Sequence, residues 1–467
     1  MPFRKRLNLS REGNQAMSKG CLVGASNITR AGDIAVVSAP IRLANVEFNV
    51  WYRVEGGIVS EDDDAFLAAA LIPAMKSAES LKLVGRVSRT LMNNSSTIQN
   101  IVHKWFPEFE KITVTSGDFT DTISGSPERG VGCFFSAGVD SFYTLLKHRE
   151  EITHLIYVHG FDIWLHEEDF RLSVLSEIRK VAKVFGKSLI FVETNIHEFS
   201  DHFADWGLQY HGAALASVAL LLTPQLRTIY APSSYAYDEL FPWGSHPLLD
   251  PMWSTESLQI VHDGNEAGRI EKVALIAQSD IALKTLRVCL DRTDGAYNCG
   301  HCEKCVRTMV NLRLSGVPLH RTSFSRELDL DAVANLVLND EHALIFAKEN
   351  LKSAKAKDDK ELAKALQQAV DRYEQRLLAN RLKMELPKLS HSPHWKTLLG
   401  PLLMAIPSGY RKWFLWELAK EQLKDWDRDT TKGRIRRAWF TLMRGADATS
   451  FTGQASQPNK APTKARQ

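Results

Sequence analysis

A short polar loop between two apolar stretches is the first candidate for chemistry in this sequence. Residues 130–135 are apolar enough for a buried strand, and apolar residues recur at helical spacing from Phe142 onward. The loop between them consists of Ser136, Ala137, Gly138, Val139, Asp140 and Ser141. A strand–loop–helix turn leaves backbone N–H groups free at the positive end of a helix dipole, which favours phosphate. The small side chains in the loop let a ligand approach the backbone.

The side chains of this loop add hydrogen-bond donors and a charge. The hydroxyls of Ser136 and Ser141 can donate, and Asp140 can cap the helix or help to hold a magnesium ion. The alternative interpretation is an ordinary strand-to-helix turn with a Ser or Asp cap, because caps of this kind are common.

Four cysteines form the second group of residues with chemical potential. They are Cys289, Cys299, Cys302 and Cys305. Three of them form a C-x-x-C-x-x-C run in which Gly300 permits a sharp turn. Four thiolates fill the tetrahedral shell of zinc and leave no position for an activated water, so we predict a structural zinc site. An iron–sulfur cluster or a redox pair is the competing interpretation, while Cys21 and Cys133 stand alone as core or surface residues.

The composition is that of a globular protein without a strong electrostatic preference. Its 467 residues are 44% hydrophobic, which suffices for packed cores in two or three domains. The formal net charge of +3 is small for this length, so no chain-wide field favours nucleic acid. The basic start is not followed by an apolar run of signal-peptide length, and the longest apolar stretches are too short to span a membrane. We therefore expect a cytoplasmic protein, in which structural disulfides are unusual.

Changes of pattern along the chain predict four regions. Residues 1–127 form a small α/β module of unknown role, in which residues 46–54 alternate like a half-buried strand. Residues 128–320 alternate strands and helices, which favours a Rossmann-like, open parallel sheet covered by helices. Within this region we expect strands at residues 155–159, 189–193 and 228–231. Residues 321–445 are helical in pattern, and residues 446–467 have the polar composition of a disordered tail.

The strand ends of the second region are expected to converge on one crevice, because open sheets bind ligands beyond the carboxyl ends of their strands. Three segments belong there: the loop at Ser136, residues 159–162 and residues 233–250. His159 and Asp162 follow the second predicted strand and are candidate adenosine contacts. The polar candidates in the substrate region are His211, Asp238, Glu239, His246 and Asp250. Each of these side chains alone is more often solvated or structural than catalytic.

The polar loop followed by Cys289 and the CGHCEKC run resembles the PP-loop ATP pyrophosphatases, and among them the 7-cyano-7-deazaguanine synthase family. The resemblance covers residues 131–314 and implies a sheet of the adenine nucleotide alpha-hydrolase type. It further implies that the loop binds ATP phosphates together with Mg²⁺ and that the four cysteines bind Zn²⁺. The family cleaves ATP between the α and β phosphates, adenylates its substrate and releases pyrophosphate. In the synthase a deazaguanine carboxylic acid passes through an amide to a nitrile.

This sequence departs from the family pattern at the loop and in the substrate region. Ala137 stands where the family usually has glycine. Residues 210–214 replace a Pro-Gly-Arg-Asn element, and the segment after Ala231 lacks a Tyr-Pro-Asp-Cys-Arg string. Asp238 follows a predicted strand end where the related synthase also carries an acid, so it joins Asp140 as a candidate catalytic residue.

We therefore predict an ATP-dependent ligase-like enzyme that adenylates a small acid, with deazapurine-like acids among the candidates, and forms an amide or nitrile. The alternatives are a tRNA-modifying PP-loop enzyme, another nucleotide-dependent amide ligase, and a non-catalytic ATP-binding component of a larger assembly. A catalytic cysteine outside the four metal-binding candidates and near the crevice would favour the first alternative, but Cys133 precedes the loop inside a strand and is poorly placed.

The last part of the chain suggests further contacts. Residues 362–377 have the pattern of an amphipathic helix that packs on the core or on a second copy in a homodimer. Residues 395–443 interleave tryptophan with arginine and lysine, a composition that suits RNA, a membrane surface or an acidic partner. A helical cap is the favoured interpretation, because tryptophan is chiefly a packing residue in helices.

Overall fold

The fold is seen in a computed structural model that describes residues 20–120, 128–289, 291, 295–339 and 341–390. Contacts divide the chain into two units, Met1–Asp371 and Arg372–Gln467. The helix α12 (Lys360–Ser390) reaches into the second unit and contains the amphipathic pattern predicted at 362–377. The tryptophan-rich stretch at 395–443 and the tail at 446–467 lie outside the described residues.

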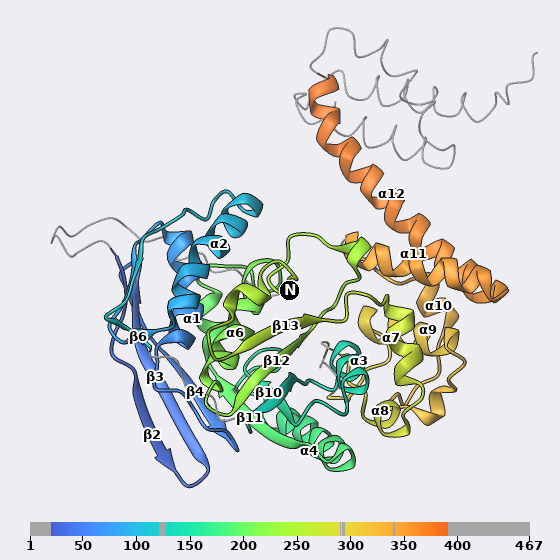
Figure 1. The fold of residues 1–467 in the computed structure, drawn as a ribbon. Helices are drawn as coiled ribbons and strands as arrows, with labels where there is room; N and C mark the ends of the chain where they lie inside the picture. Colours follow the sequence, from blue (N-terminus) through green and yellow to red (C-terminus); the bar gives the residue numbers. More distant parts are fainter. Residues whose placement is uncertain (1–19, 121–127, 290, 292–294, 340, 391–467) are drawn as a thin grey trace, which may run out of the picture. The chain divides into compact units, whose positions relative to one another are not determined.

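A sheet of eleven strands runs through the first unit (Figure 1). Its order is β13 (Gln259–Asp263), β12 (Leu226–Pro232), β9 (Gly130–Phe134), β10 (His154–His159), β11 (Ser188–Thr194), β4 (Val46–Glu55), β3 (Ile34–Leu43), β1 (Cys21–Val23), β5 (Leu81–Leu83) and β7 (Val114–Thr115), with β2 (Asn27–Ala31) on β3. All pairs from β13 to β11 are parallel, whereas β4 joins β11 and β3 in antiparallel fashion. A second sheet pairs β6 (Arg86–Val87) with β8 (Asp118–Phe119). The predicted α/β class with a large, mostly parallel, Rossmann-like sheet is confirmed.

The parallel part of the sheet has the strand order of a doubly wound fold. Counted from β9 as strand 1, the order β11–β10–β9–β12–β13 is 3-2-1-4-5. The direction of winding reverses between β9 and β12, and ligands of such folds bind at the carboxyl ends of the strands on both sides of that point. The polar loop follows β9, so the topology places it at the switch point.

Helices cover both faces of the sheet, which explains why its inner strands are apolar on both sides. Along β10, Ile156 faces one hydrophobic cluster while Leu155 and Tyr157 face the other. The first cluster includes α1 (Asp64–Ser77), α2 (Arg89–Trp105), α5 (Ile196–Ser200) and α6 (His211–Leu221). The second includes α3 (Val139–Lys147), α4 (Glu168–Phe185), α7 (Arg269–Ile276), α8 (Asp280–Thr285) and α9 (Glu303–Leu314). The short α10 (Leu330–Ala334) precedes α11 (Glu341–Ala356), which packs on α9.

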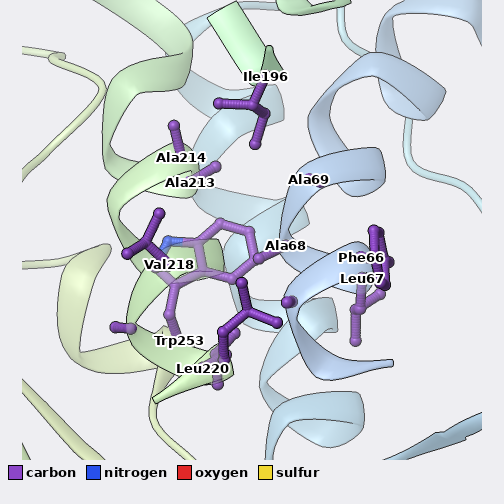
Figure 2. Close-up of a cluster of buried hydrophobic side chains, with 14 of the residues drawn as sticks. Phe66, Leu67, Ala68, Ala69, Ile196, Ala213, Ala214, Val218, Leu220 and Trp253 are labelled. Atoms are coloured by element: carbon purple, nitrogen blue, oxygen red, sulfur yellow. The ribbon is translucent and has the colours of Figure 1, made fainter. Parts of the chain in front are cut away.

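Residues 20–120 share their sheet and core with the segment that follows. The strand β4 pairs with β11, and α1 packs against α6. Figure 2 shows the indole of Trp253 between these two helices, near Ala68 and Val218. The hydroxyl of Tyr210 donates to the carbonyl oxygen of Ala69 over 2.7 Å. Truncating a buried tryptophan costs about 3–5 kcal/mol, so Trp253 contributes substantially to holding α1 on α6.

Most elements predicted for the parallel sheet are confirmed, with shifts at their ends. The strands predicted at 155–159, 189–193 and 228–231 are β10, β11 and β12. The helix after the polar loop begins earlier than predicted, at Val139, so the last residues assigned to the loop form its first turn. None of the described helices combines the length and apolarity needed to cross a membrane.

Candidate functional site

The polar loop presents its backbone amides without acceptors. Ala137 has a φ of 60°, in the left-handed region, and Gly138 is the extended N-cap residue of α3. This conformation turns the chain from β9 into the helix. Within the described residues, none of the backbone N–H groups at 136–141 donates a hydrogen bond to the protein. Unpaired amides at the start of a helix form an anion site, because the dipole adds positive potential to the free donors.

The loop opens into a cavity of about 760 Å³. The three segments expected at the strand ends all contribute to its lining: the loop itself, Phe161 and Asp162 after β10, and Ser234, Tyr235, Trp243 and Ser245 after β12. Further lining residues come from η1 (Trp206–Tyr210), α9 and α11. A cavity of this volume is in the range of cofactor and small-molecule sites.

Asp140 is fixed by two cations of α7. Arg269 donates to its Oδ2 over 3.0 Å, and Lys272 donates to its Oδ1 over 3.1 Å. Burial disfavours the carboxylate, but Arg269 and Lys272 outweigh burial, and the pKa of Asp140 is lowered. Lys272 also donates to the carbonyl oxygen of Ser233 after β12. The ion pair therefore joins the start of α3 to α7 and to the strand on the other side of the switch point.

Three further cations line the cavity near the loop. Arg287 is buried, and its backbone N–H donates to the carbonyl oxygen of Ala137 over 2.8 Å. Arg307 packs its guanidinium 4.2 Å from the ring centroid of Phe346 in α11. Lys304 lines the cavity without a hydrogen-bond or ion-pair partner among the described residues. The surrounding protein disfavours its charged form and lowers its pKa, while the charge of Asp162 acts in the opposite direction. We call the loop, Arg269, Arg287, Lys304 and Arg307 the basic wall.

The four predicted cysteines come together in a possible metal site. Their Sγ atoms all lie within 4.8 Å of one another. The Sγ atoms of Cys289 and Cys302 are 4.0 Å apart, and those of Cys299 and Cys305 are 3.8 Å apart. A tetrahedral zinc with Zn–S bonds of about 2.3 Å requires S···S separations of roughly 3.8 Å, so the spacing fits. The cluster can therefore bind a metal such as zinc.

This cysteine cluster is built into the basic wall. Cys302 is the N-cap of α9, and Cys305 lies in its first turn. Lys304 stands between these two cysteines, and Arg287 precedes Cys289 by two residues. A metal bound by the cysteines would therefore hold the start of α9 and the segment of Arg287 in one place, and with them the cations that face the loop.

Another part of the cavity is aromatic. We call Phe161, Trp206, His211 and Trp243 the aromatic wall. The ring centroids of His211 and Trp243 are 5.4 Å apart, and those of Phe161 and Trp206 are 5.1 Å apart. Trp206 opens the π-helical turn η1, a rare element that occurs often at functional sites. Gly212 permits this turn to pack closely on the next segment, because a Cβ there would lie 2.0 Å from the carbonyl oxygen of Gly244.

Three of the predicted candidates take part in structural contacts. His159 is buried outside the cavity wall, with Nδ1 3.1 Å from a carboxylate oxygen of Glu193 and Nε2 3.0 Å from the carbonyl oxygen of Trp164. Asp250 accepts from Ser245 over 2.6 Å and lies 2.7 Å from His262, with all three side chains largely buried. His246 packs its ring against Trp105 and does not line the cavity.

The remaining candidates divide between the cavity and the surface. Ser136, Gly138, Val139, Asp140 and Ser141 line the cavity, as do Asp162 and His211. Ala137 is buried beneath the loop. Asp238 is exposed and Glu239 caps its own short 3-10 turn, η2 (Tyr237–Glu239), and neither lines the cavity. The structure therefore does not bring Asp238 to Asp140, and its catalytic role stays a prediction.

The residues missed in the sequence are mostly cations and aromatic rings. Arg269 and Lys272 lie three residues apart on α7, a spacing that places them on one helix face. Lys304 and Arg307 lie in and just after the cysteine run, and this proximity was a usable signal. Nothing in the local sequence marks Trp206 or Phe346, which reach the cavity from distant segments.

Comparison of the chain with models of protein families, with curated proteins and with solved structures finds no match. The functional argument therefore depends on the site itself.

Proposed function

We propose that this protein is a PP-loop enzyme that cleaves ATP between its α and β phosphates, adenylates a small acid and releases pyrophosphate. The observation that carries the proposal is the loop at 136–141, whose free amides face a cavity bordered by Arg269, Arg287, Lys304 and Arg307. A pyrophosphate leaving group gains negative charge in the transition state. Fixed donors and cations stabilise that charge without having to reorganise.

In this proposal each part of the basic wall has a task. The amides of the loop hold the pyrophosphate portion, and Lys304 supplies a cation that the protein does not already neutralise by a direct contact. Asp140 positions Arg269 and Lys272. Mg²⁺, when bound with ATP, would neutralise part of the phosphate charge.

The cysteine cluster has a structural task in the same proposal. A zinc ion bound by all four thiolates leaves no coordination position for a substrate or a reactive water. It would act by fixing the first turn of α9 and the segment of Arg287. In this proposal a phosphate loop at the switch point and a metal-binding cysteine cluster beside it together form a site of the adenine nucleotide alpha-hydrolase type.

The acid substrate is proposed to occupy the aromatic wall. Trp206 and Trp243 provide flat apolar surfaces on which a planar ring can stack. A deazapurine-like carboxylic acid satisfies this requirement, and its adenylated carboxylate would react with an amine to give an amide and, after a second activation, a nitrile. Transfer to a tRNA base is the outcome to test if no free acid reacts.

The test is pyrophosphate release by the purified protein with ATP, Mg²⁺ and a panel of planar heteroaromatic acids that includes deazaguanine carboxylic acid. We expect AMP and pyrophosphate in equal amounts only when an accepted acid is present. An ATP analogue with a methylene bridge between the α and β phosphates is the control, because it binds without being cleaved there. Asp140→Asn should abolish release, since Arg269 and Lys272 lose their anionic partner.

Two results would exclude an adenylating enzyme. One is release of ADP and phosphate in place of AMP and pyrophosphate. The other is ATP binding without turnover for every acid and for tRNA, combined with an Asp140→Asn variant that changes only complex formation. The second result would identify a non-catalytic ATP-binding component.

A further inference from the structure

The imidazole of His211 has a defined proton position. Its Nδ1 lies 3.2 Å from the carbonyl oxygen of Trp206 and 2.9 Å from that of Gly207. Carbonyl oxygens only accept hydrogen bonds, so Nδ1 must carry the proton. In the neutral ring Nε2 then carries a lone pair.

No residue in the described part of the chain donates to that lone pair. Nε2 of His211 has no hydrogen-bond partner within the described residues, and it is not among the fully buried polar atoms that lack one. His211 lines the cavity, and an Nε2 atom that is not fully buried is available to a ligand there. By contrast, His159 uses both ring nitrogens in contacts with protein oxygens.

The surroundings keep this ring neutral and in place. Burial disfavours the imidazolium and lowers the pKa of His211, against the opposing influence of Asp250, the two carbonyl groups and Asp162. The ring of Trp243 packs against it at 5.4 Å. His211 is the first residue of α6, directly after the π-helical turn, and Gly244 leaves room for it, since a Cβ there would lie 2.7 Å from Nδ1.

We propose that His211 is the general base of the second half-reaction, in which an amine attacks the adenylated acid. This inference rests on the proposed function and adds a catalytic residue to it. His211 sits on the aromatic wall, beside the position assigned to the acid, whereas the loop and its cations hold the phosphates. An unprotonated nitrogen at the acid's end of the cavity is what an attacking amine requires.

The step balances without a further reactant. The amine nitrogen forms a bond to the acyl carbon, and a proton of the amine passes to Nε2 of His211. The tetrahedral intermediate then expels AMP, whose phosphate oxygen keeps the electron pair of the broken C–O bond. The products are the amide, AMP and a protonated His211, which returns its proton to water.

Lys304 is the competing base, because it also lines the cavity and has a lowered pKa. Its place on the basic wall argues against that role. Lys304 lies between two cysteines of the metal cluster and within electrostatic reach of Arg269 and Arg307, where a cation serves the phosphates. A base for the amine has to be at the acyl carbon, on the side of His211.

The first experiment tests the exposed lone pair directly. Diethyl pyrocarbonate acylates unprotonated histidine nitrogens that reagents can reach, and mass spectrometry locates the labelled residue. We expect rapid labelling of His211 and much slower labelling of His159 in the same folded protein. Equal protection of both histidines would overturn the assignment.

The second experiment separates the two half-reactions. His211→Asn keeps an N–H donor near the position of Nδ1 and removes Nε2. With ammonia and the acid that supports pyrophosphate release, we expect amide formation to fall about 10²–10⁴-fold further than ATP–pyrophosphate exchange. Added imidazole should restore part of the amide rate. His103→Asn is the matched control, because its Nδ1 also bonds a carbonyl oxygen, that of Phe109, away from the cavity.

The outcomes distinguish this inference from the function on which it rests. If His211→Asn exchanges pyrophosphate and forms amide at unchanged rates, the base is another group while the proposed function stands. An equal loss in both half-reactions without imidazole rescue also rejects His211 as the base. If the unchanged protein releases no pyrophosphate with any acid or tRNA, the proposed function fails and the role of His211 fails with it.

Discussion

The basic wall and the aromatic wall of one cavity are built in different ways. The basic wall starts from two stretches that are continuous in sequence, the loop at 136–141 and the cysteine run at 299–305, and both provide local geometry that a ligand can use. The aromatic wall collects Phe161, Trp243 and the pair Trp206 and His211 from three separate segments. The difference teaches that a phosphate site can be encoded by a few adjacent residues, whereas the site for the second substrate depends on the packing between segments.

The two walls also differ in how they treat charge. On the basic wall, Asp140 offsets only part of the positive charge of Arg269 and Lys272, and Lys304 is left without a partner in the described part of the chain. On the aromatic wall, burial keeps His211 neutral. Positive charge and free amides favour phosphate binding, whereas an imidazole accepts a proton only in its neutral form, so the separation of the walls suits a reaction with two stages.

Among the changes considered, removal of the metal is expected to produce the largest difference between the basic wall and the aromatic wall. Structural zinc in small peptides contributes about 10–16 kcal/mol of apparent binding free energy. Chelation or Cys302→Ser should therefore loosen α9 and abolish ATP binding, while α6 with His211 stays protected. Hydrogen exchange of the two helices and metal analysis measure this difference.

The control for the metal prediction is Cys21→Ala, which alters a buried cysteine of β1 outside the cluster. It should leave the metal content unchanged. If the purified protein contains iron and sulfide, the four cysteines bind an iron–sulfur cluster and the zinc assignment is wrong. If α9 stays protected from hydrogen exchange in the metal-free protein, a metal is not needed to position the basic wall.

Loss of Lys304 is expected to have the next largest effect. A hydrogen bond to a charged group contributes about 1.5–3 kcal/mol, so Lys304→Ala should weaken ATP binding roughly 10- to 150-fold. Binding of the acid should change little. Calorimetric titration with the non-cleavable ATP analogue measures the effect, and Lys352→Ala, an exposed lysine of α11, is the matched control. An equal loss in both variants would mean that only net charge matters.

The two walls should also differ in the pH at which their ionisable side chains stop contributing to the stability of the fold. The pKa of His211 is lowered from 6.5 in the folded protein, so its contribution to stability is complete above pH 6.5 and is lost as the pH falls below that value. The pKa of Asp140 is lowered from 3.8, so its contribution persists until the pH falls below 3.8. Urea unfolding between about pH 7 and pH 5 should show the stability difference between the unchanged protein and His211→Asn shrinking.

Over the same range the difference between the unchanged protein and Asp140→Asn should stay constant. A constant difference for His211→Asn would show that the ring is not held neutral by the fold.

The smallest effect is expected at Ala137. Its left-handed backbone costs about 1–2 kcal/mol for a residue with a Cβ, whereas glycine loses about 0.5–1 kcal/mol through the entropy of the unfolded chain. Ala137→Gly should therefore raise the free energy of unfolding by about 1 kcal/mol or less and keep pyrophosphate release. Ala137→Val should destabilise the protein, because the site is buried and the left-handed region disfavours branched side chains. Thermal unfolding of both variants tests the sign.

The sequence by itself determined the features that depend on local spacing. Short apolar runs identified β10, β11 and β12, because a strand between two helical layers must be apolar on both faces. The small residues after β9 predicted the turn, since few side chains permit such an approach to the backbone. The C-x-x-C-x-x-C run predicted the convergence of its thiols, because that spacing returns the chain to one point.

Only the tertiary structure decided which distant groups meet these local features. Arg269 is 129 residues from Asp140, and no local pattern could pair them. His159 and Asp238 both followed predicted strand ends. The side chain of His159 nevertheless contacts Glu193, and the side chain of Asp238 lies on the surface. The proton of His211 is placed by two carbonyl groups of a π-helical turn that sequence periodicity does not predict. The physical reason is that strand ends fix the backbone position, whereas side-chain direction and protonation depend on the neighbours that packing brings.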